Sequence, residues 1–170
     1  MFSTVTLSDG TRLLIRPIRP DDKTELQRGL SRLSVETIHK RFLTAKPRLS
    51  ATELRYLTEV DGVDHIALVA IELTWPHRLV AVARAVRLPD RPDTAEWAIV
   101  VADPYQGKRL GSRLVSELAA AARRQGIRRF TAVMQHDNVA VARLLARAAP
   151  VFERDERHGG LREVTALLAA

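Results

Sequence analysis

Residues 94–125, TAEWAIVVADPYQGKRLGSRLVSELAAAARRQ, form the stretch that decides the fold. They open with an apolar run over residues 95–102, in which residues 99–101 are all β-branched. β-branched residues at this density predict a strand that is buried on both faces. Asp103 and Pro104 should end the strand, because proline has no amide hydrogen for the ladder and restricts the residue before it.

An amphipathic helix should follow the turn at residues 106–111. Its apolar side chains recur every four residues, and Gly126 supplies a stop signal at the far end. A strand, a short turn that contains glycine and a helix N-terminus together make an anion site, because the first amides of a helix have no internal partners and its dipole adds positive charge. The apolar positions are Leu110, Leu114, Leu118 and Ala122.

The spacing within the turn argues against two common phosphate-binding motifs. It is not Gly-x-Gly-x-x-Gly and has no Gly-Lys-Ser/Thr, so the dinucleotide fold and the P-loop fit badly. It resembles the GNAT superfamily of N-acetyltransferases, whose signature is Gln/Arg-x-x-Gly-x-Gly/Ala at a helix start. Gln106 and Gly111 match the outer positions, and Val101 matches the usual valine at the strand end. Arg109 replaces the middle glycine, and we expect it to adopt helical backbone angles.

The resemblance implies an α/β fold with a mixed, mostly antiparallel central sheet and helices on both faces. It also implies an N-acetyltransferase, a type of acyltransferase that uses acetyl-CoA as the donor and an amine as the acceptor. Residues 101–107, 129–132 and 137–139 look like the bacterial protein-lysine acetyltransferases within the family. Those enzymes often carry an extra cyclic-nucleotide domain. We expect one domain over residues 1–170, with no room for a second.

The order of the other predicted elements suits such a sheet. Asp9 and Gly10 indicate a hairpin, and residues 127–134 should lie parallel to residues 95–101 because they are entered directly from a helix. The resemblance also implies that the segment before residue 65 forms the floor of the acceptor pocket. Further strands are predicted at residues 4–7, 11–18, 65–73, 79–88, 152–157 and 161–168. Helices are predicted from Asp21 or Asp22 as cap, and at residues 34–42, 50–57 and 138–148.

Composition narrows the function further. The 170 residues are 46% hydrophobic, which is sufficient for one sizeable core, and the chain has no cysteine, which excludes disulfides and an acyl-cysteine intermediate. The N-terminus lacks a signal-peptide pattern, and the longest apolar run is too short to span a bilayer, so we expect a cytoplasmic protein without a membrane partner. Five scattered histidines do not indicate a metal site. A monomer and a homodimer both remain open.

The net charge of +7 suggests an anionic partner. Nucleic acid is not favoured, because aromatic residues make up only 5% of the chain and the arginines are dispersed. The sequence does not decide whether the acceptor amine belongs to a protein lysine or to a small molecule. A catalytically silent acyl-CoA-binding module is the alternative, since two family positions are changed.

The resemblance implies which residues bind acetyl-CoA. Backbone amides of the loop would hold the pyrophosphate, and the backbone near the strand end would pair with the pantetheine arm. The side chains of Lys108, Arg109 and Arg113 either add charge to the phosphates or are ordinary solvated cations. Asn138 bonds the pantetheine arm, caps its helix, or does both. A side chain at Gly111 should crowd the pyrophosphate. The binding residues are Val100, Val101, Gln106, Gly107, Lys108, Arg109, Leu110, Gly111, Ser112 and Asn138.

Glu96 is the candidate general base, because an attacking amine must lose a proton. It is a lone carboxylate in an apolar strand, and we expect desolvation to raise its proton affinity into a useful range. The alternatives are an exposed strand residue or an ion-pair partner of Arg84. Many family members place a tyrosine acid where this chain has Leu145, so water, Tyr105 or another group would protonate the leaving thiolate.

Overall fold

The computed structural model describes residues 2–44 and 48–169. In that part of the chain, eight strands form one sheet in the order β1-β2-β3-β4-β5-β6-β8-β7. Neighbouring strands are antiparallel except β5 and β6, which run parallel, so that prediction is confirmed. The strands are β1 (Ser3–Thr6), β2 (Arg12–Pro17), β3 (His65–Glu72), β4 (Leu79–Leu88), β5 (Arg91–Val101), β6 (Arg129–Gln135), β7 (Val151–His158) and β8 (Leu161–Leu167).

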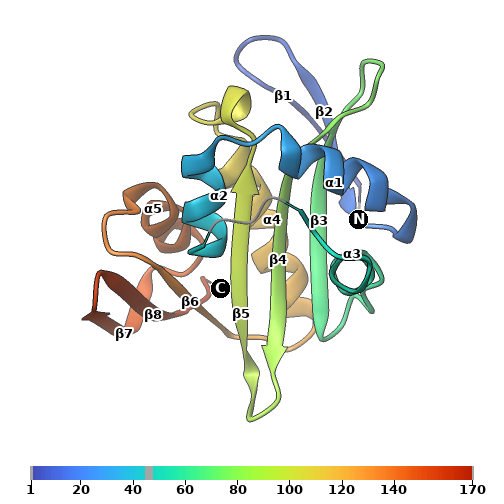
Figure 1. Cartoon of the computed structure of the whole chain (residues 1–170). Coiled ribbons are helices and arrows are strands. Elements are labelled where there is room, and N and C mark those ends of the chain that lie inside the picture. The colour runs from blue at the N-terminus through green and yellow to red at the C-terminus, as the bar shows by residue number, and fades with distance from the viewer. Residues whose placement is uncertain (1, 45–47, 170) are drawn as a thin grey trace.

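Helices cover both faces of this sheet (Figure 1). Helices α1, α2 and α3 lie in front of the sheet in that view, and α4 lies behind it. Helix α5 packs against α4. The predicted fold class is therefore confirmed. The helices are α1 (Lys23–Ser31), α2 (Val35–Phe42), α3 (Ala51–Thr58), α4 (Leu110–Arg124) and α5 (Val139–Ala148), with short 3₁₀ helices η1 (Pro20–Asp22) and η2 (Asp103–Tyr105).

Serines cap two of the predicted helices, whereas the predicted aspartate cap of the first helix is wrong. Ser34 accepts a hydrogen bond from an amide of α2, and Ser50 forms a capping box with Glu53 at the start of α3. Each such cap contributes about 1 kcal/mol. Asp22 precedes α1 without capping it through its side chain. Its carboxylate instead accepts two hydrogen bonds from the guanidinium of Arg16, at 2.7 and 2.8 Å.

Strand β5 differs from its prediction in extent and in burial. It begins at Arg91, several residues before the predicted start. It is not buried on both faces, because its side chains alternate: Ala95 and Trp97 are buried, whereas Glu96 between them is exposed. The odd-numbered side chains face α4, and the even-numbered ones face the side covered by α1–α3. The second face is only partly covered, which leaves room for the site described below.

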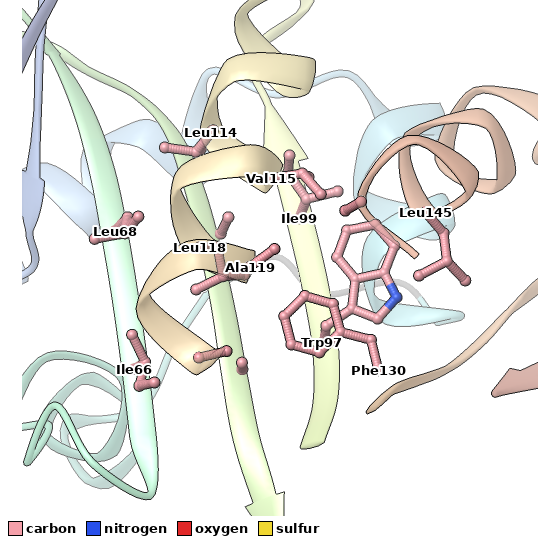
Figure 2. Packing of buried hydrophobic residues seen from close by; sticks show 14 of the residues in the cluster. Ile66, Leu68, Trp97, Ile99, Leu114, Val115, Leu118, Ala119, Phe130 and Leu145 are labelled. Carbon is pink, nitrogen blue, oxygen red and sulfur yellow. The ribbon is translucent and has the colours of Figure 1, made fainter. Parts of the chain in front are cut away.

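The main core lies between the sheet and α4. Figure 2 shows Leu114 and Leu118 of α4 pointing towards the strands, with Trp97 and Phe130 stacked beside them. The predicted apolar stripe of α4 is confirmed, since its four side chains are at most 1% exposed. Burying a leucine side chain contributes about 1.5–3 kcal/mol. This packing fixes the N-terminus of α4 relative to the end of β5.

Candidate active site

Strands β5 and β6 diverge at the centre of the sheet. They pair only from Thr94 to Glu96 on β5. In an antiparallel pair, successive residues direct their backbone groups to opposite sides. Because the amide of Ala102 bonds to β4, the backbone groups of Val101 and Ile99 point the other way, into the gap beyond the paired segment. This edge of β5 can pair with an extended ligand, whereas Val100, which was predicted beside Val101, directs its backbone to β4.

The side chain of Gln106 fills one place at this edge. Its Nε2 donates to the carbonyl oxygen of Val101 at 2.9 Å and to Oγ1 of Thr37 at 3.3 Å. Gln106 therefore joins the loop to β5 and to α2. The amide of Val101 and the backbone of Ile99 remain available to a ligand.

The loop before α4 contains two left-handed residues. Gly107 has φ 72° and Arg109 has φ 65°. The prediction that Arg109 adopts helical angles is therefore wrong, because its backbone lies in the left-handed region, which glycine adopts without steric cost. A left-handed conformation costs a residue with a Cβ about 1–2 kcal/mol. The loop holds its shape because the surrounding packing fixes it.

Gly111 is required by packing of the protein against itself. A Cβ at this position would lie 3.1 Å from Cδ1 of Leu144 on α5 and 3.8 Å from Cδ1 of Ile99. The first contact is tighter than ordinary van der Waals distance. The prediction that a side chain here would also crowd the pyrophosphate stays a prediction. Gly111 therefore sets how closely α4 approaches α5.

A cleft of about 700 Å³ joins these elements. Its walls come from α2, the end of β5, the loop and α5, and eight of the ten predicted binding residues line it. The eight are Val100, Val101, Gln106, Gly107, Arg109, Gly111, Ser112 and Asn138. Among its described lining residues, cationic side chains outnumber acidic ones by five to two, so the cleft suits an anion. The cations are Lys40, Arg41, Arg109, Arg143 and Arg147.

Two predicted binding residues turn their side chains elsewhere. Leu110 is buried in the core beneath the loop. The Nζ of Lys108 lies 2.6 Å from a carboxylate oxygen of Asp9 and 5.7 Å from the ring centre of Tyr105. Only the backbone of Leu110 and Lys108 could serve an anion here.

Four cations that line the cleft were not among the binding residues predicted from the sequence. Lys40 and Arg41 come from α2, and Arg143 and Arg147 come from α5. The four-residue spacing of Arg143 and Arg147 places them on one helix face, but the same spacing is typical of a solvated face. Their approach to the loop depends on how α5 packs against α4.

Asn138 is buried at the start of α5 and lines the cleft. Its side-chain oxygen accepts a hydrogen bond from the amide of Val141 at 3.3 Å. The helix-cap interpretation is therefore confirmed. The side-chain amide nitrogen is left for a second partner, so a role toward the ligand is compatible with the cap.

Glu96 lies on the face of β5 that α1–α3 cover, and it is exposed. The expected desolvation of this carboxylate is wrong, because the side chain is exposed to water. No ion pair joins it to Arg84 in the described part of the chain. Its charge acts on Arg41 instead: burial lowers the pKa of Arg41, and the negative charge of Glu96 opposes that lowering.

No tyrosine acid is poised over the cleft in the described part of the chain. Leu145, at the family's tyrosine position, is fully buried in the core, and Figure 2 shows it close to Trp97. Tyr105 lines the cleft, but its hydroxyl donates to a carboxylate oxygen of Glu72 at 2.5 Å. Burial, with this hydrogen bond, raises the pKa of Tyr105 to about 12. Its proton is therefore held more tightly than that of an ordinary phenol.

Residues 2–44 and 48–169 contain neither a metal-binding cluster nor a membrane-spanning helix. No group of three or more His, Asp or Glu side chains is arranged to hold a metal ion. No helix is both long and apolar enough to cross a bilayer.

Comparison with known proteins identifies relatives of the chain. Residues 33–149 match the model of the acetyltransferase (GNAT) family. Acetyltransferase Pat of Mycolicibacterium smegmatis is 34% identical over 152 residues, which cover 89% of this chain but 45% of that protein. Acetyltransferase PA5475 of Pseudomonas aeruginosa is 32% identical over 151 residues, covering 88% of this chain and 81% of that protein. The chain thus spans less than half the length of Pat.

Solved structures resemble the chain over nearly its full length. The GNAT domain of S. lividans PAT superposes with a TM-score of 0.84 at 30% identity, covering 98% of this chain and 97% of that one. The structure of yncA from Salmonella typhimurium with acetyl-CoA has a TM-score of 0.71 at 18% identity, covering 92% of each chain. The second likeness concerns the fold alone.

Proposed function

Because this chain belongs to the GNAT family of acetyltransferases, whose donor is acetyl-CoA, we propose that it transfers the acetyl group directly to an amine and that the acceptor is a protein lysine. The observation that best supports acetyl transfer is the gap between β5 and β6, with the loop of residues 106–111 at its end. Residues 101–107 and 137–139, which look like protein-lysine acetyltransferases, support the lysine acceptor.

The residues of the cleft fit acetyl-CoA. The free backbone groups of Ile99 and Val101 suit the amide-rich pantetheine arm. The first amides of α4 and the open space at Gly107, where a Cβ would meet nothing within 4 Å, suit the pyrophosphate. Arg143 and Arg147 can add charge to the phosphates. Bound acetyl-CoA supplies a thioester that is reactive toward amines.

We assign Glu96 the role of general base. It takes one proton from the acceptor ammonium, directly or through one water, which its exposure permits. The neutral nitrogen then forms a bond to the acetyl carbon while the carbon–sulfur bond breaks, and the nitrogen loses its second proton to solvent, which leaves a neutral amide. The sulfur leaves as a thiolate, and water supplies its proton, because Leu145 carries none and Tyr105 is engaged by Glu72.

A thiol-release assay with lysine peptides and with small amines tests this function. We expect turnover on peptides in the presence of acetyl-CoA, with the product confirmed by mass spectrometry. Efficient acetylation of free small amines with none of peptides would contradict the lysine acceptor. Tight acetyl-CoA binding by calorimetry without turnover on any amine would favour the alternative, a catalytically silent acyl-CoA-binding module.

A further inference from the structure

A second, smaller cavity lies beside the cleft, and two arginines, the buried Arg84 and the partly buried Arg41, set its character. Its volume is about 60 Å³, and its walls come from α1, α2, α3 and the facing sides of β4 and β5. Most of these walls are apolar, for example Leu30, Phe42 and Val82. Arg84 and Arg41 are the charged groups that line it within the described chain. A water molecule occupies about 30 Å³ in the liquid, so the cavity has room for a small polar group.

Arg84 is a buried cation without an acidic partner. It is 6% exposed, and in the described part of the chain no carboxylate lies within ion-pair distance of it. Its guanidinium reaches the carbonyl oxygen of Leu57 at 3.3 and 3.4 Å, which is long for a hydrogen bond. This carbonyl belongs to the last turn of α3 and supplies only partial negative charge. Burial and the nearby charge of Arg41 lower the pKa of Arg84 to about 10.

His65 is a second close neighbour of Arg84, and it does not neutralise the charge. The Nη1 of Arg84 lies 3.0 Å from Nε2 of His65, which must therefore be an unprotonated acceptor. Burial, together with the charge of Arg84, lowers the pKa of His65 to about 4, so the ring is neutral near pH 7. His65 accordingly orients the guanidinium and leaves its positive charge uncompensated.

Arg41 adds a second cation at the boundary between the two spaces. Its guanidinium lies 4.9 Å from the ring centre of Phe42, and in the described residues it forms no ion pair with a carboxylate. Arg41 and Val100 line both the cavity and the cleft. Side chains two residues apart on a strand share a face, so Glu96, Ala98 and Val100 all point to this side of β5. The cavity therefore adjoins the proposed base and the place where the acetyl group would be presented.

Burying the cation of Arg84 without a carboxylate partner is unfavourable, so this arrangement is costly unless a ligand completes it. The planar guanidinium of Arg84 matches a carboxylate, which can accept two parallel hydrogen bonds. We propose that this cavity binds a carboxylate of the acceptor, so that the preferred acceptor carries a carboxylate close to its reacting amine. The proposal rests on the proposed acetyl transfer. The carboxylate could come from a free amino acid or from an acidic residue beside a lysine.

Paired acceptors that differ only in the carboxylate test this proposal. One arm compares protein amino acids with their carboxamides, and the other compares lysine peptides flanked by Asp or Glu with peptides flanked by Asn or Gln. We expect kcat/KM to be about 10- to 100-fold higher for the acid in at least one arm, because a hydrogen bond to a charged group is stronger than one to a neutral group. The arm that shows the preference identifies the source of the carboxylate.

Arg84→Met should abolish the preference, mainly through a rise in KM for the acid. Because Arg84 does not line the larger cleft, the affinity for acetyl-CoA should remain unchanged, and calorimetry on the variant checks that it is folded. Arg55→Met, which removes an exposed cation of α3, should keep the preference. Arg84→Lys keeps the charge without the planar fork and should give an intermediate preference; it replaces Arg84→Met if that variant does not fold.

The salt dependence of the preference for acids distinguishes binding at the buried site from attraction by the overall charge of the protein. The preference should change less than about twofold between about 50 and about 500 mM salt, because buried pairs are screened weakly. Loss of the preference at high salt, equal rates for acids and amides, or an unchanged preference in Arg84→Met would each overturn the proposal.

Thermal denaturation with added CoA distinguishes failure of this proposal from failure of the proposed function. Selective binding of the acid raises the melting temperature whether or not turnover occurs. Stabilisation by acids but not by amides, without acetylation of either, would contradict the transfer and support the carboxylate site. Acetylation of both classes at equal rates would support the transfer and contradict the carboxylate site.

Discussion

At the scale of single residues, the position of Glu96 along β5 determines which way the side chain of the proposed base points. Glu96 is even-numbered, like Ala98 and Val100, so the alternation of the strand directs it to the acceptor side, while Trp97 points into the core. Its neighbour across the strand pair is Val86, so no cation on β4 faces it directly. A carboxylate that keeps contact with water and lies near the cleft can pass its proton to solvent after each turnover.

Glu96→Gln should lower the rate of the chemical step by about 10²–10⁴-fold, the usual contribution of general-base catalysis. The amide keeps the size and hydrogen bonding of the side chain but cannot accept the proton. Acetyl-CoA affinity should stay within a few-fold, because the loop and the edge of β5 lie further along the chain. Single-turnover kinetics and calorimetry provide the two measurements.

A matched control removes an exposed carboxylate from the turn between β4 and β5. Asp90→Asn should leave turnover within a few-fold, since Asp90 lies in the turn before β5, at the opposite end of the strand from the loop of residues 106–111. A pH–rate profile that is the same in the wild type and in Glu96→Gln would refute the assignment.

Arg109→Gly should relieve the left-handed backbone at the start of α4. The relief of about 1–2 kcal/mol is partly offset by the greater freedom of glycine in the unfolded chain, about 0.5–1 kcal/mol. We expect a net gain in the free energy of unfolding of about 1 kcal/mol or less, measured by urea denaturation. Ser112→Gly, within the helix proper, should instead destabilise by about 1 kcal/mol. Destabilisation by both changes would contradict the strain at Arg109.

At the scale of elements, the site depends on how α4 meets α5. Gly111 lets the first turn of α4 approach Leu144, and this contact places the cations of α5 beside the loop. On the opposite side, Asp103 holds α2: its carboxylate accepts hydrogen bonds from the amide and hydroxyl of Ser34 at 3.0 and 2.8 Å and from Thr37 at 2.7 Å. The cleft is thus bounded by two helices fixed to the same short segment.

Gly111→Ala should weaken acetyl-CoA binding modestly, through displacement of α5, whereas Gly111→Glu should abolish it by bulk and charge. In the alanine variant the new methyl group meets the flexible end of Leu144, which can move by a few tenths of an ångström. Adding Leu144→Ala to Gly111→Ala should therefore restore part of the lost affinity, as expected of residues in contact. Calorimetry on the single and double variants measures the coupling.

Additive effects in this cycle would show that Gly111 and Leu144 do not interact. Unchanged acetyl-CoA affinity in Gly111→Glu would contradict the location of the donor site itself.

At the scale of the whole molecule, the buried His65–Arg84 pair couples stability to pH. The pKa of His65 is lowered to about 4 in the folded protein, against about 6.5 in an unfolded chain. The unfolded state therefore binds more protons between these values. The contribution of His65 is fully present above pH about 6.5 and is lost as the pH falls toward about 4.

His65→Gln should flatten the decline in stability between pH about 6.5 and about 4, where the wild type loses about 1–3 kcal/mol through this residue. Glutamine can still accept the hydrogen bond from Arg84 but does not titrate. Urea denaturation across this pH range, with exposed His158→Gln as the control, measures the difference. Parallel pH profiles for wild type and His65→Gln would show that the ring is not buried as a neutral acceptor.

Local patterns predicted most of the fold. The β-branched run of β5, the four-residue stripe of α4 and the capping serines Ser34 and Ser50 each depend on neighbours within a few residues, so periodicity and capping chemistry suffice to predict them. The loop signature likewise led to most of the binding residues that line the cleft. Two predictions failed because the deciding contacts are distant in sequence: the desolvation of Glu96 and the free side chain of Lys108, which pairs with Asp9. The left-handed backbone of Arg109 is a failure of a local prediction.

The sequence by itself thus determined the order of elements, the position of the loop before α4 and the family, because these depend on residues close together in the chain. Only the tertiary structure decided that β5 and β6 diverge after Glu96 and that Arg84 is buried without a carboxylate. Both features arise when α2, α3, β4 and β5, which lie far apart in sequence, pack together. Burial and charge compensation are properties of that packing, so no local pattern encodes them.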